Sequence, residues 1–422
     1  MGVRRVLSRL PSEVAAATEA AQREHWGRVL AATLRLARDL DIAEEATADA
    51  FLLALQTWPD TGVPESVEAW LLTVARRRAV DRIRRAAVLR NRLTALAVTQ
   101  ATVVEGPENE LIEPVVQDDD LRLVVLCCHP ALTTEAQVAL MLRIGCGATT
   151  STIAAGFLVS ESTMAARLTR AKKRIAVSGV DLDLPDDLAV DDRMPVVRRA
   201  VQLAYSLGHT AASGSQLRDD ELADRALHLA RSLNRAKPMD RENAALLGLL
   251  LFSQARAGSR VTANGVQVLL EDVDRNSWNR EMTAEAQRCT TFAAGGATSG
   301  PFARQAAIAA EHARAPSFEA TDWSRIVALY GDLLELEPSP VMALGRCQAL
   351  SYLHGPAVGL ADLDEVMALG GLEKYCYAHA ARAQLLDRLG RTHEARRAWV
   401  RAASTARTDA EREYFGSRAS SV

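Results

Sequence analysis

The chain has 422 residues and a formal net charge of −3, and 48% of its residues are hydrophobic but only 5% are aromatic. A chain of this length can bury a sizeable core and is expected to divide into two to four domains. Few aromatic residues beside many Ala, Leu and Arg favour close helix packing over β-sandwiches, so the sequence predicts an all-α protein. We find no signal peptide and no run of about 18 apolar residues that would span a bilayer, which predicts a cytoplasmic protein without membrane attachment.

The six cysteines are spread along the chain without the CxxC pairs that are typical of zinc sites, so we expect no disulfide, metal or cofactor. The cluster Cys127-Cys128-His129 is the one candidate for a metal or redox site. Adjacent residues of a helix point about 100° apart, however, and do not readily surround one tetrahedral ion. We therefore favour core packing for this cluster, and structural roles for His312 and His379.

Charge is distributed in blocks along the N-terminal part of the chain. Residues 76–92 contain eight arginines and one acid, whereas residues 105–120 contain seven acids and no base. Residues 1–178 carry 22 Lys and Arg against 21 Asp and Glu, which leaves 28 against 32 for residues 179–422. Two basic segments on either side of an acidic one indicate two nucleic-acid contacts joined by a tether.

An early helix is expected over DIAEEATADAFLLALQTWP, with Asp41 as a candidate N-cap and Pro59 at its end. Small and apolar residues follow one side of this helix, and Glu44, Glu45 and Asp49 follow the other. Glu45 and Asp49 are four residues apart, so their like charges lie together and repel each other. A basic partner would relieve this repulsion; the alternative is a solvated acidic face.

A second amphipathic helix is expected over VEAWLLTVARRRAVDRIRRA, in which Arg76, Arg77, Arg84 and Arg85 line the exposed side. A basic face near an aromatic residue suits single-stranded DNA, because cations follow the phosphates while bases stack or enter pockets. The aromatic residue here is Trp70, for which core packing is the favoured interpretation and base stacking the alternative.

Further along, TSTIAAGFLVSESTMAARLTRAKKRI predicts two short helices about a tight turn, with Ser160 as the N-cap of the second helix. Apolar residues recur on one side of this second helix, and the other side carries Arg167, Arg170, Lys172, Lys173 and Arg174. The pattern is typical of a helix-turn-helix that binds duplex DNA. The alternative is a solvated basic helix in a bundle.

From about residue 185 the chain is a succession of Ala- and Leu-rich helices in which a repeat is visible. Small, large, glycine and aromatic residues occur at the spacing of a tetratricopeptide unit, at Ala383, Leu386, Gly390, Ala395, Trp399 and Ala402. Related positions in earlier units are Ile326, Tyr330, Leu333, Pro338, Gly355 and Leu360, with a period of about 34 to 35 residues. The sequence therefore predicts a C-terminal α-solenoid with a concave interaction surface.

These segments, in this order, resemble the extracytoplasmic-function sigma factors of bacterial RNA polymerase. DIAEEATADAFLLALQTWP is similar to the polymerase-binding helix of that family, AWLLTVARRRAVDRIRR to its promoter-melting and minus-ten-reading helix, and residues 150–175 to its minus-thirty-five-reading region. The remaining helices resemble a subgroup with a fused tetratricopeptide-like domain. The resemblance implies sigma region 2 at residues 12–92, a flexible acidic linker at 93–120, sigma region 4 at 121–178 and a helical regulatory domain at 185–418.

The resemblance also implies partners and contact residues. The partners are core RNA polymerase, promoter DNA as a duplex upstream element and a single-stranded minus-ten element, and an unknown protein or ligand at the C-terminal domain. Polymerase contact is implied for Asp41, Glu44, Glu45, Asp49 and Phe51. Contact with the minus-ten element is implied for Trp70, Arg76, Arg77, Asp81, Arg84 and Arg85, and contact with the upstream element for Ser162, Thr163, Ala166, Arg167, Arg170 and Lys173.

Two other classes of protein compete with this interpretation. A helix-turn-helix sensor-regulator would bind an operator without polymerase, but it leaves the acidic and arginine-rich helices unexplained. An enzyme in the C-terminal half would need a convergent acid, base and nucleophile, and the sequence offers no such set and no phosphate-binding glycine loop. The sequence thus favours a promoter-specificity subunit that is regulated in cis by its C-terminal domain.

Overall fold

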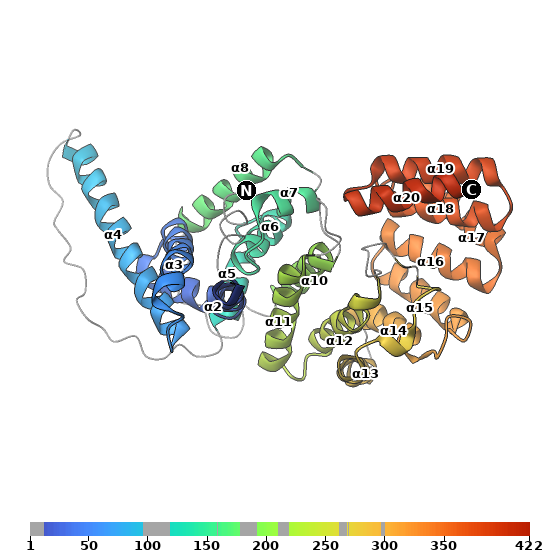
Figure 1. Cartoon of the computed structure of the whole chain (residues 1–422), viewed down its shortest axis with the longest axis horizontal. Coiled ribbons are helices and arrows are strands. Elements are labelled where there is room, and N and C mark those ends of the chain that lie inside the picture. The colour runs from blue at the N-terminus through green and yellow to red at the C-terminus, as the bar shows by residue number, and fades with distance from the viewer. Residues whose placement is uncertain are drawn as a thin grey trace. The chain divides into compact units, whose positions relative to one another are not determined.

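A computed structural model describes residues 12–95, 119–157, 159–177, 192–209, 219–260, 268, 270–296 and 300–422, and these residues form helices without a strand (Figure 1). The all-α prediction is confirmed. The chain divides into two compact units, residues 1–200 and 201–422. No helix in the described ranges is long and apolar enough to cross a membrane.

The helices of the first unit are α2 (Ser12–Ala37), α3 (Leu40–Thr61), α4 (Val67–Ala95), α5 (Asp119–Cys127), α6 (Thr134–Ile144), α7 (Thr150–Gly156), α8 (Glu161–Val177) and the first part of α10 (Met194–His209). The second unit continues with α11 (Asp220–Ala236), α12 (Arg241–Ala255), η1 (Ala257–Arg260), η2 (Arg275–Ser277), α13 (Arg280–Ala294), α14 (Pro301–Arg314), α15 (Trp323–Leu336), α16 (Pro340–Leu353), α17 (Pro356–Ala368), α18 (Cys376–Arg388), α19 (Thr392–Thr405) and α20 (Asp409–Ser421).

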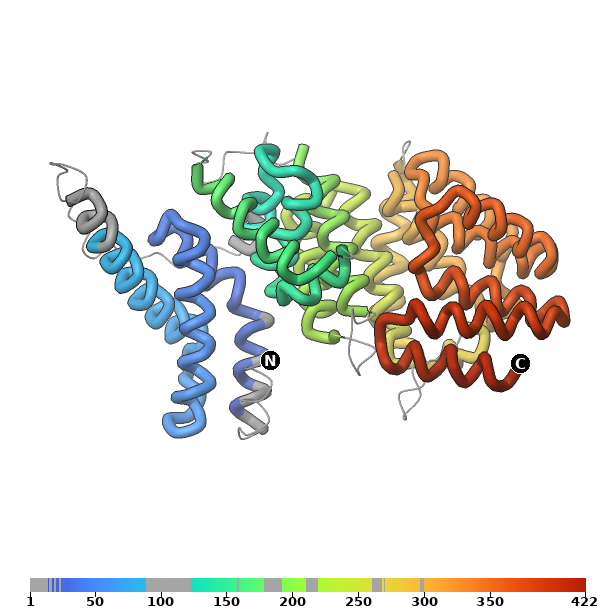
Figure 2. The backbone as a smooth tube through the Cα atoms, turned by 90° about the horizontal axis from the view of Figure 1, so that it is seen from above, coloured from blue at the N-terminus to red at the C-terminus, as the bar shows by residue number. Residues whose placement is uncertain are grey.

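Helices α2, α3 and α4 pack side by side around one hydrophobic core (Figure 2). Trp58 and Leu71 are among the fully buried members of this core. The predicted ends of α3 were wrong by a few residues. Asp39, not Asp41, caps the helix by accepting a hydrogen bond from the Ile42 amide, and the helix continues through Pro59 to Thr61. A proline in the last turn removes only one backbone hydrogen bond, and the turn to the next helix is made at Gly62, where φ is +80°.

Helices α5 to α8 form a second cluster within the same unit, and α5 packs against α2. Ser160 accepts a hydrogen bond from the Thr163 amide at 3.2 Å, so it caps α8 as predicted. Met164, Leu168, Ala171 and Ile175 are the buried residues of α8 and leave its opposite side exposed. The acidic linker expected at residues 93–120 lies almost wholly outside the described residues, as does the boundary expected near residue 185.

In the second unit, consecutive helices from α14 to α20 pack against their neighbours in the chain. Helices α16 and α18 begin at residues 340 and 376, and α17 and α19 begin at 356 and 392, so both intervals are 36 residues. This repeat is close to the period expected from the sequence. The helix pairs approach closely at Gly359, where an added Cβ would lie 2.4 Å from the Cβ of Ser351. Such close approach requires a small residue at this position.

Candidate polymerase and nucleic-acid interfaces

The acidic side of α3 is held against α4 by Arg82. The Arg82 guanidinium donates to Glu45 at 3.0 Å and to Asp49 at 2.9 Å. Burial alone would lower the pKa of Arg82, but its hydrogen bonds and charge interactions with Glu45 and Asp49 raise it. The like charges four residues apart on α3 therefore have their basic partner within the fold, although the Glu45 side chain remains 66% exposed.

Glu44 has a different environment from its neighbour Glu45, because its side chain is only 8% exposed. Arg143 of α6 donates to Oε1 of Glu44 at 2.6 Å, and Lys172 of α8 donates to Oε2 at 2.6 Å. Lys172 also donates to Asp41 at 2.8 Å. Burial opposes the charge of Lys172, but the hydrogen bonds to Asp41 and Glu44 outweigh it and raise the lysine pKa. We name Asp41, Glu44, Arg143 and Lys172 together the α3–α8 clasp.

Of two predicted contact residues, Phe51 lies in the hydrophobic core of the first unit and the half-buried Trp70 packs against that core. Phe51 is 5% exposed and packs against the ring of Trp26, with centroids 5.6 Å apart. Trp70 packs edge-on against Trp58 at 5.5 Å and borders the same core. The contacts of Trp70 agree with the packing interpretation, and Phe51 offers little surface to a partner in this arrangement.

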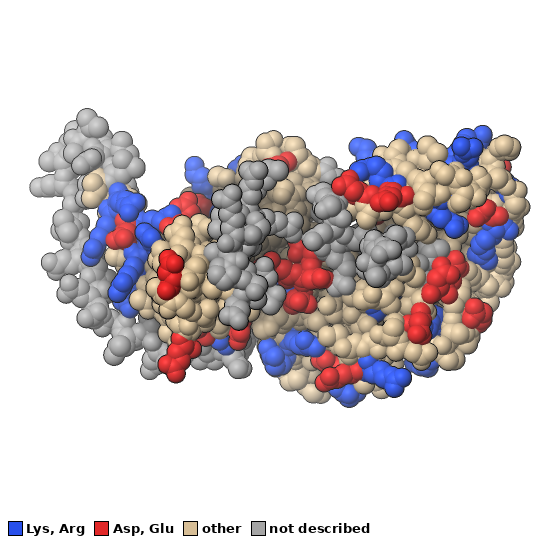
Figure 3. All heavy atoms as spheres, in the orientation of Figure 1, with Lys and Arg blue, Asp and Glu red and all other residues tan. Residues whose placement is uncertain are grey.

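The charged side of α4 carries the basic face that the sequence predicts. Arg77, Asp81, Arg84 and Arg85 are exposed, and Arg76 is half-buried. Lys and Arg side chains gather along this helix in Figure 3. The exposed cations follow the helix over more than two turns, which is an arrangement that can follow the phosphates of a nucleic-acid strand.

On α8, the candidate DNA-binding side is open at its N-terminal half. Ser162, Thr163, Ala166, Arg170 and Lys173 are exposed. Arg167 is half-buried, since its guanidinium lies over the ring of Phe157 at 5.7 Å from the centroid. Lys172 was expected on the same basic face but turns toward α3 instead. The helix therefore presents one side to solvent and gives one of its cations to the clasp.

Sequence reasoning missed Arg82, Arg143 and Lys172 as partners of the acidic helix. For Arg82 a signal was present: Leu71, Ala75 and Ala79 are buried at spacings of four, and position 82 continues that side of α4. No comparable signal pairs Arg143 or Lys172 with Glu44. These residues are 99 and 128 positions away from Glu44 in the chain.

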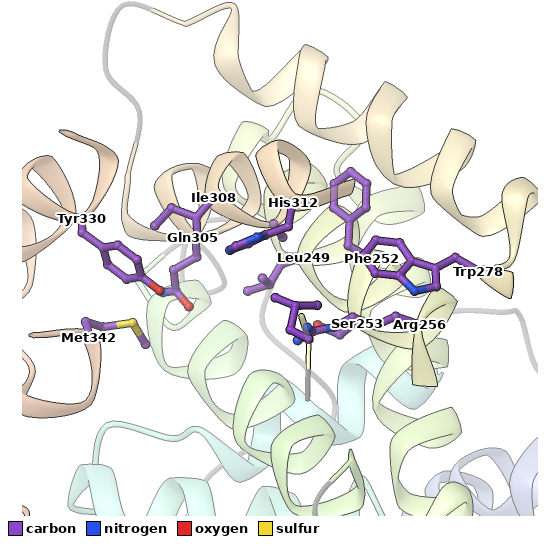
Figure 4. A pocket seen from close by; sticks show the side chains of 12 residues that line it. Leu249, Phe252, Ser253, Arg256, Trp278, Gln305, Ile308, His312, Tyr330 and Met342 are labelled. Carbon is purple, nitrogen blue, oxygen red and sulfur yellow. The ribbon is translucent and has the colours of Figure 1, made fainter. Parts of the chain in front are cut away.

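The second unit contains a pocket of about 230 Å³ (Figure 4). Gln305, Ile308 and His312 reach it from α14, and Tyr330 and Met342 come from the next two helices. Nδ1 of His312 is buried without a hydrogen-bond partner among the described residues. Burial, with help from Arg256 and Arg275, lowers the pKa of His312 to about 4, so its ring is neutral at neutral pH. The other lining residues are Leu249, Phe252, Ser253, Arg256, Leu270, Trp278 and Ala309.

The cysteine cluster expected to be packing lies inside the first unit. Cys127 and Cys128 are buried. Burial raises the pKa of Cys128 to about 12 and that of Cys127 well above its ordinary value. Both thiols are therefore protonated at neutral pH, which makes them poor nucleophiles.

Comparison with known proteins identifies related chains. Residues 22–88 match the family described as sigma-70 region 2, and residues 193–294 match a family of unknown function, DUF6596. The uncharacterized protein R00370 of Rhizobium meliloti is 40% identical over 92% of both chains. The ECF RNA polymerase sigma factor SigK of Mycolicibacterium vanbaalenii is 31% identical over 33% of this chain and 70% of its own length. SigK of Mycobacterium sp. strain KMS is 36% identical over 24% of this chain and 51% of its own length. No solved structure matches.

Proposed function

We propose a mode of action from one premise: this chain belongs to the ECF RNA polymerase sigma factors and carries a C-terminal extension. It acts as a non-enzymatic sigma factor. In our proposal it binds core RNA polymerase, directs initiation at specific promoters and is regulated in cis by its C-terminal helices. This role places the protein in the cytoplasm, where its partners are.

Polymerase docking is assigned to the acidic side of α3, with Asp41, Glu44, Glu45 and Asp49 facing a basic surface of the core enzyme. Glu45 supports this assignment because it is largely exposed while Arg82 fixes its orientation. A fixed, partly exposed acid loses little conformational freedom on meeting a basic partner. Complementary charges of this kind speed association and fix the register of the two surfaces.

The exposed cations of α4 are the observation that carries the proposal, because they lie within the stretch that matches sigma-70 region 2. Arg77, Arg84 and Arg85 would hold phosphates of the non-template strand while minus-ten bases leave the stack. Unstacking costs a few kcal/mol per base, which phosphate contacts and base pockets must offset. Asp81 lies among these arginines, where a carboxylate accepts hydrogen bonds from an exposed base edge.

The start of α8 is assigned to the upstream duplex element. Ser162, Thr163 and Ala166 are small and exposed, so the helix can enter a major groove closely there. Arg170 and Lys173 follow on the same exposed side. The contact of Arg167 with Phe157 fixes the direction of its guanidinium beside the turn.

The C-terminal extension is assigned a regulatory role. Residues 179–422 carry 28 Lys and Arg against 32 Asp and Glu, and this negative balance disfavours DNA as their ligand. Stacked helix pairs provide an extended surface for a protein or for the N-terminal helices themselves. The 230 Å³ pocket is below the usual range for drug-sized ligands, which is about 300–1,000 Å³, so a ligand there would be small.

The test is transcription in vitro from a promoter of the source organism, with core enzyme in the presence and absence of the full chain. We expect specific transcripts only when the chain is present. The Arg84→Ala/Arg85→Ala variant should lower open-complex formation about tenfold and leave core binding unchanged, because it removes phosphate contacts only. Arg401→Ala, an exposed arginine of α19, is the matched control. Operator binding by the chain without any response of core enzyme would instead identify a sensor-regulator.

A further inference from the structure

The 230 Å³ pocket of the second unit has an unbalanced set of lining side chains (Figure 4). Among the lining residues that the structure describes, Arg256 carries a charge at neutral pH and none is an acid. Arg256 is the half-buried C-cap residue of α12. The other polar lining side chains are uncharged at neutral pH, and they belong to Ser253, Trp278, Gln305, His312 and Tyr330.

The titratable side chains of the pocket report a positive potential inside it. Burial, followed by the charges of Arg256 and Arg275, lowers the pKa of His312 to about 4. Burial raises the pKa of Tyr330, and the charge of Arg256 opposes that rise. No acid among the described residues contributes to either pKa, although a nearby carboxylate would shift both upward. The charges that act on this pocket therefore favour an anion.

The rest of the wall would hold an apolar group. It consists of Leu249, Phe252, Leu270, Ile308, Ala309 and Met342. Trp278 is 8% exposed, and its Nε1, like Nδ1 of His312, is buried without a hydrogen-bond partner among the described residues. Apolar walls with a few polar groups that fix orientation are characteristic of pockets for small organic molecules.

The size of the pocket limits what can enter. A water molecule takes about 30 Å³ in the liquid, so a volume of about 230 Å³ corresponds to a few waters and not to a nucleotide. One ring with one acidic group is of suitable size. All lining residues lie between positions 249 and 342, so the pocket belongs to the second unit alone.

We propose that this pocket binds a small organic acid as its anion, with the carboxylate against Arg256 and a compact apolar body against Phe252, Ile308 and Met342. A guanidinium can donate two parallel hydrogen bonds to a carboxylate, which fixes the direction of the ligand as well as binding it. The inference goes beyond the proposed function, because it gives the C-terminal helices a ligand of stated chemistry. It does not require sigma activity and is tested without polymerase.

The test compares three ligands that share one ring and differ in charge. Benzoate is the anionic probe, benzamide is its neutral counterpart and benzylamine is its cationic counterpart. Calorimetric titration of the full chain should give a dissociation constant of about 1 mM or lower for benzoate. Benzamide should bind about tenfold more weakly, because it lacks the charge, and benzylamine should not bind detectably.

Variants at Arg256 test the position of the carboxylate. Arg256→Gln should weaken benzoate binding about tenfold and remove its preference over benzamide. Arg256→Lys should keep that preference and lose part of the affinity, because lysine has the charge without the planar fork. Arg325→Gln is the matched control and should bind as the parent does, since Arg325 is exposed on α15, the helix that carries Tyr330. Helical circular dichroism checks that each variant is folded.

A further variant leaves Arg256 in place. Ala309→Leu enlarges a lining side chain and should weaken benzoate and benzamide alike, and this variant decides the question if Arg256→Gln does not fold. Equal binding of benzoate and benzamide to the parent, or no binding of benzoate, would overturn the inference. Benzoate binding that neither Arg256→Gln nor Ala309→Leu weakens would also overturn it, because the anion would then lie elsewhere, for example on the basic helices of the first unit. Transcription with core enzyme tests the sigma function separately.

Discussion

At the scale of single residues, buried titratable groups decide how the protein responds to pH. His312 of α14 has its Nδ1 buried without a hydrogen-bond partner among the described residues and packs edge-on against Trp323, with ring centroids 5.5 Å apart. Burial, followed by the nearby Arg256 and Arg275, lowers its pKa to about 4. The folded chain therefore resists the proton that an unfolded histidine accepts near pH 6.5.

This difference predicts a loss of stability in mild acid. His312 imposes no cost above pH 6.5, and its cost grows as the pH falls toward 4, because only the unfolded chain binds the proton in that range. Between pH 7 and pH 5 the wild type should lose about 2 kcal/mol that His312→Phe does not lose. Urea unfolding at the two pH values, followed by helical circular dichroism, measures this difference. His393→Gln is the control at an exposed position, and an equal loss in the wild type and His312→Phe would contradict the assignment.

At the scale of helices, packing in the second unit depends on close approach at particular glycines. An added Cβ at Gly359 of α17 would lie 2.4 Å from the Cβ of Ser351 and 2.7 Å from the carbonyl oxygen of Cys347. One of these neighbours is backbone, so α16 and α17 would have to separate. Gly416 of α20 has nothing within 4 Å of the same position.

Gly359→Ala and Gly416→Ala should consequently have opposite effects on stability. We expect Gly359→Ala to cost about 1–3 kcal/mol through overpacking. Gly416→Ala should stabilise by about 0.5–1 kcal/mol, because alanine has the higher helix propensity and meets no neighbour. Amide hydrogen exchange of peptides from α16–α17 and from α20 measures each effect locally. Faster exchange of α20 in Gly416→Ala, or unchanged exchange of α16–α17 in Gly359→Ala, would contradict this account.

Helices were also the level at which the sequence was most informative. The buried stripe of α8 and its Ser160 cap follow from local patterns, and the structure contains both. The ends of α3 could not be predicted from local patterns. At its start, Asp39 and Asp41 are equally good caps by residue type. At its end, Pro59 lies in the last turn, where a proline removes only one backbone hydrogen bond and does not stop the helix. The pairing of Glu44 with Lys172 depends on how α8 meets α3. Helical periodicity says which side of each helix is apolar, but not which distant helix covers it.

At the scale of the whole chain, the two compact units meet within a helix. The division falls between Ala200 and Val201, inside α10. Just before this helix, the buried guanidinium of Arg193 donates to the carbonyl of Val125 in α5 at 3.2 Å. The first unit therefore needs residues beyond the boundary that was expected near 185.

Truncation separates this structural need from the regulatory role. A chain that ends at residue 200 should be more stable than one that ends at 190, by about 1–3 kcal/mol, because only the longer chain supplies the charged donor for Val125. Thermal unfolding of the two truncated chains measures the difference. Both should transcribe severalfold less than the full chain in the purified system, since both lack the C-terminal extension. Full activity of the 1–200 chain in purified transcription and in cells would show that the second unit does not regulate.

The clasp has a consequence for how sequences of this kind can vary. Glu44 is almost wholly covered, and it pairs with both Arg143 and Lys172. Removing one partner of such a covered ion pair leaves a charge uncompensated, which is strongly destabilising. Basic residues at positions 143 and 172 should therefore be gained and lost together with the acid at position 44 among relatives.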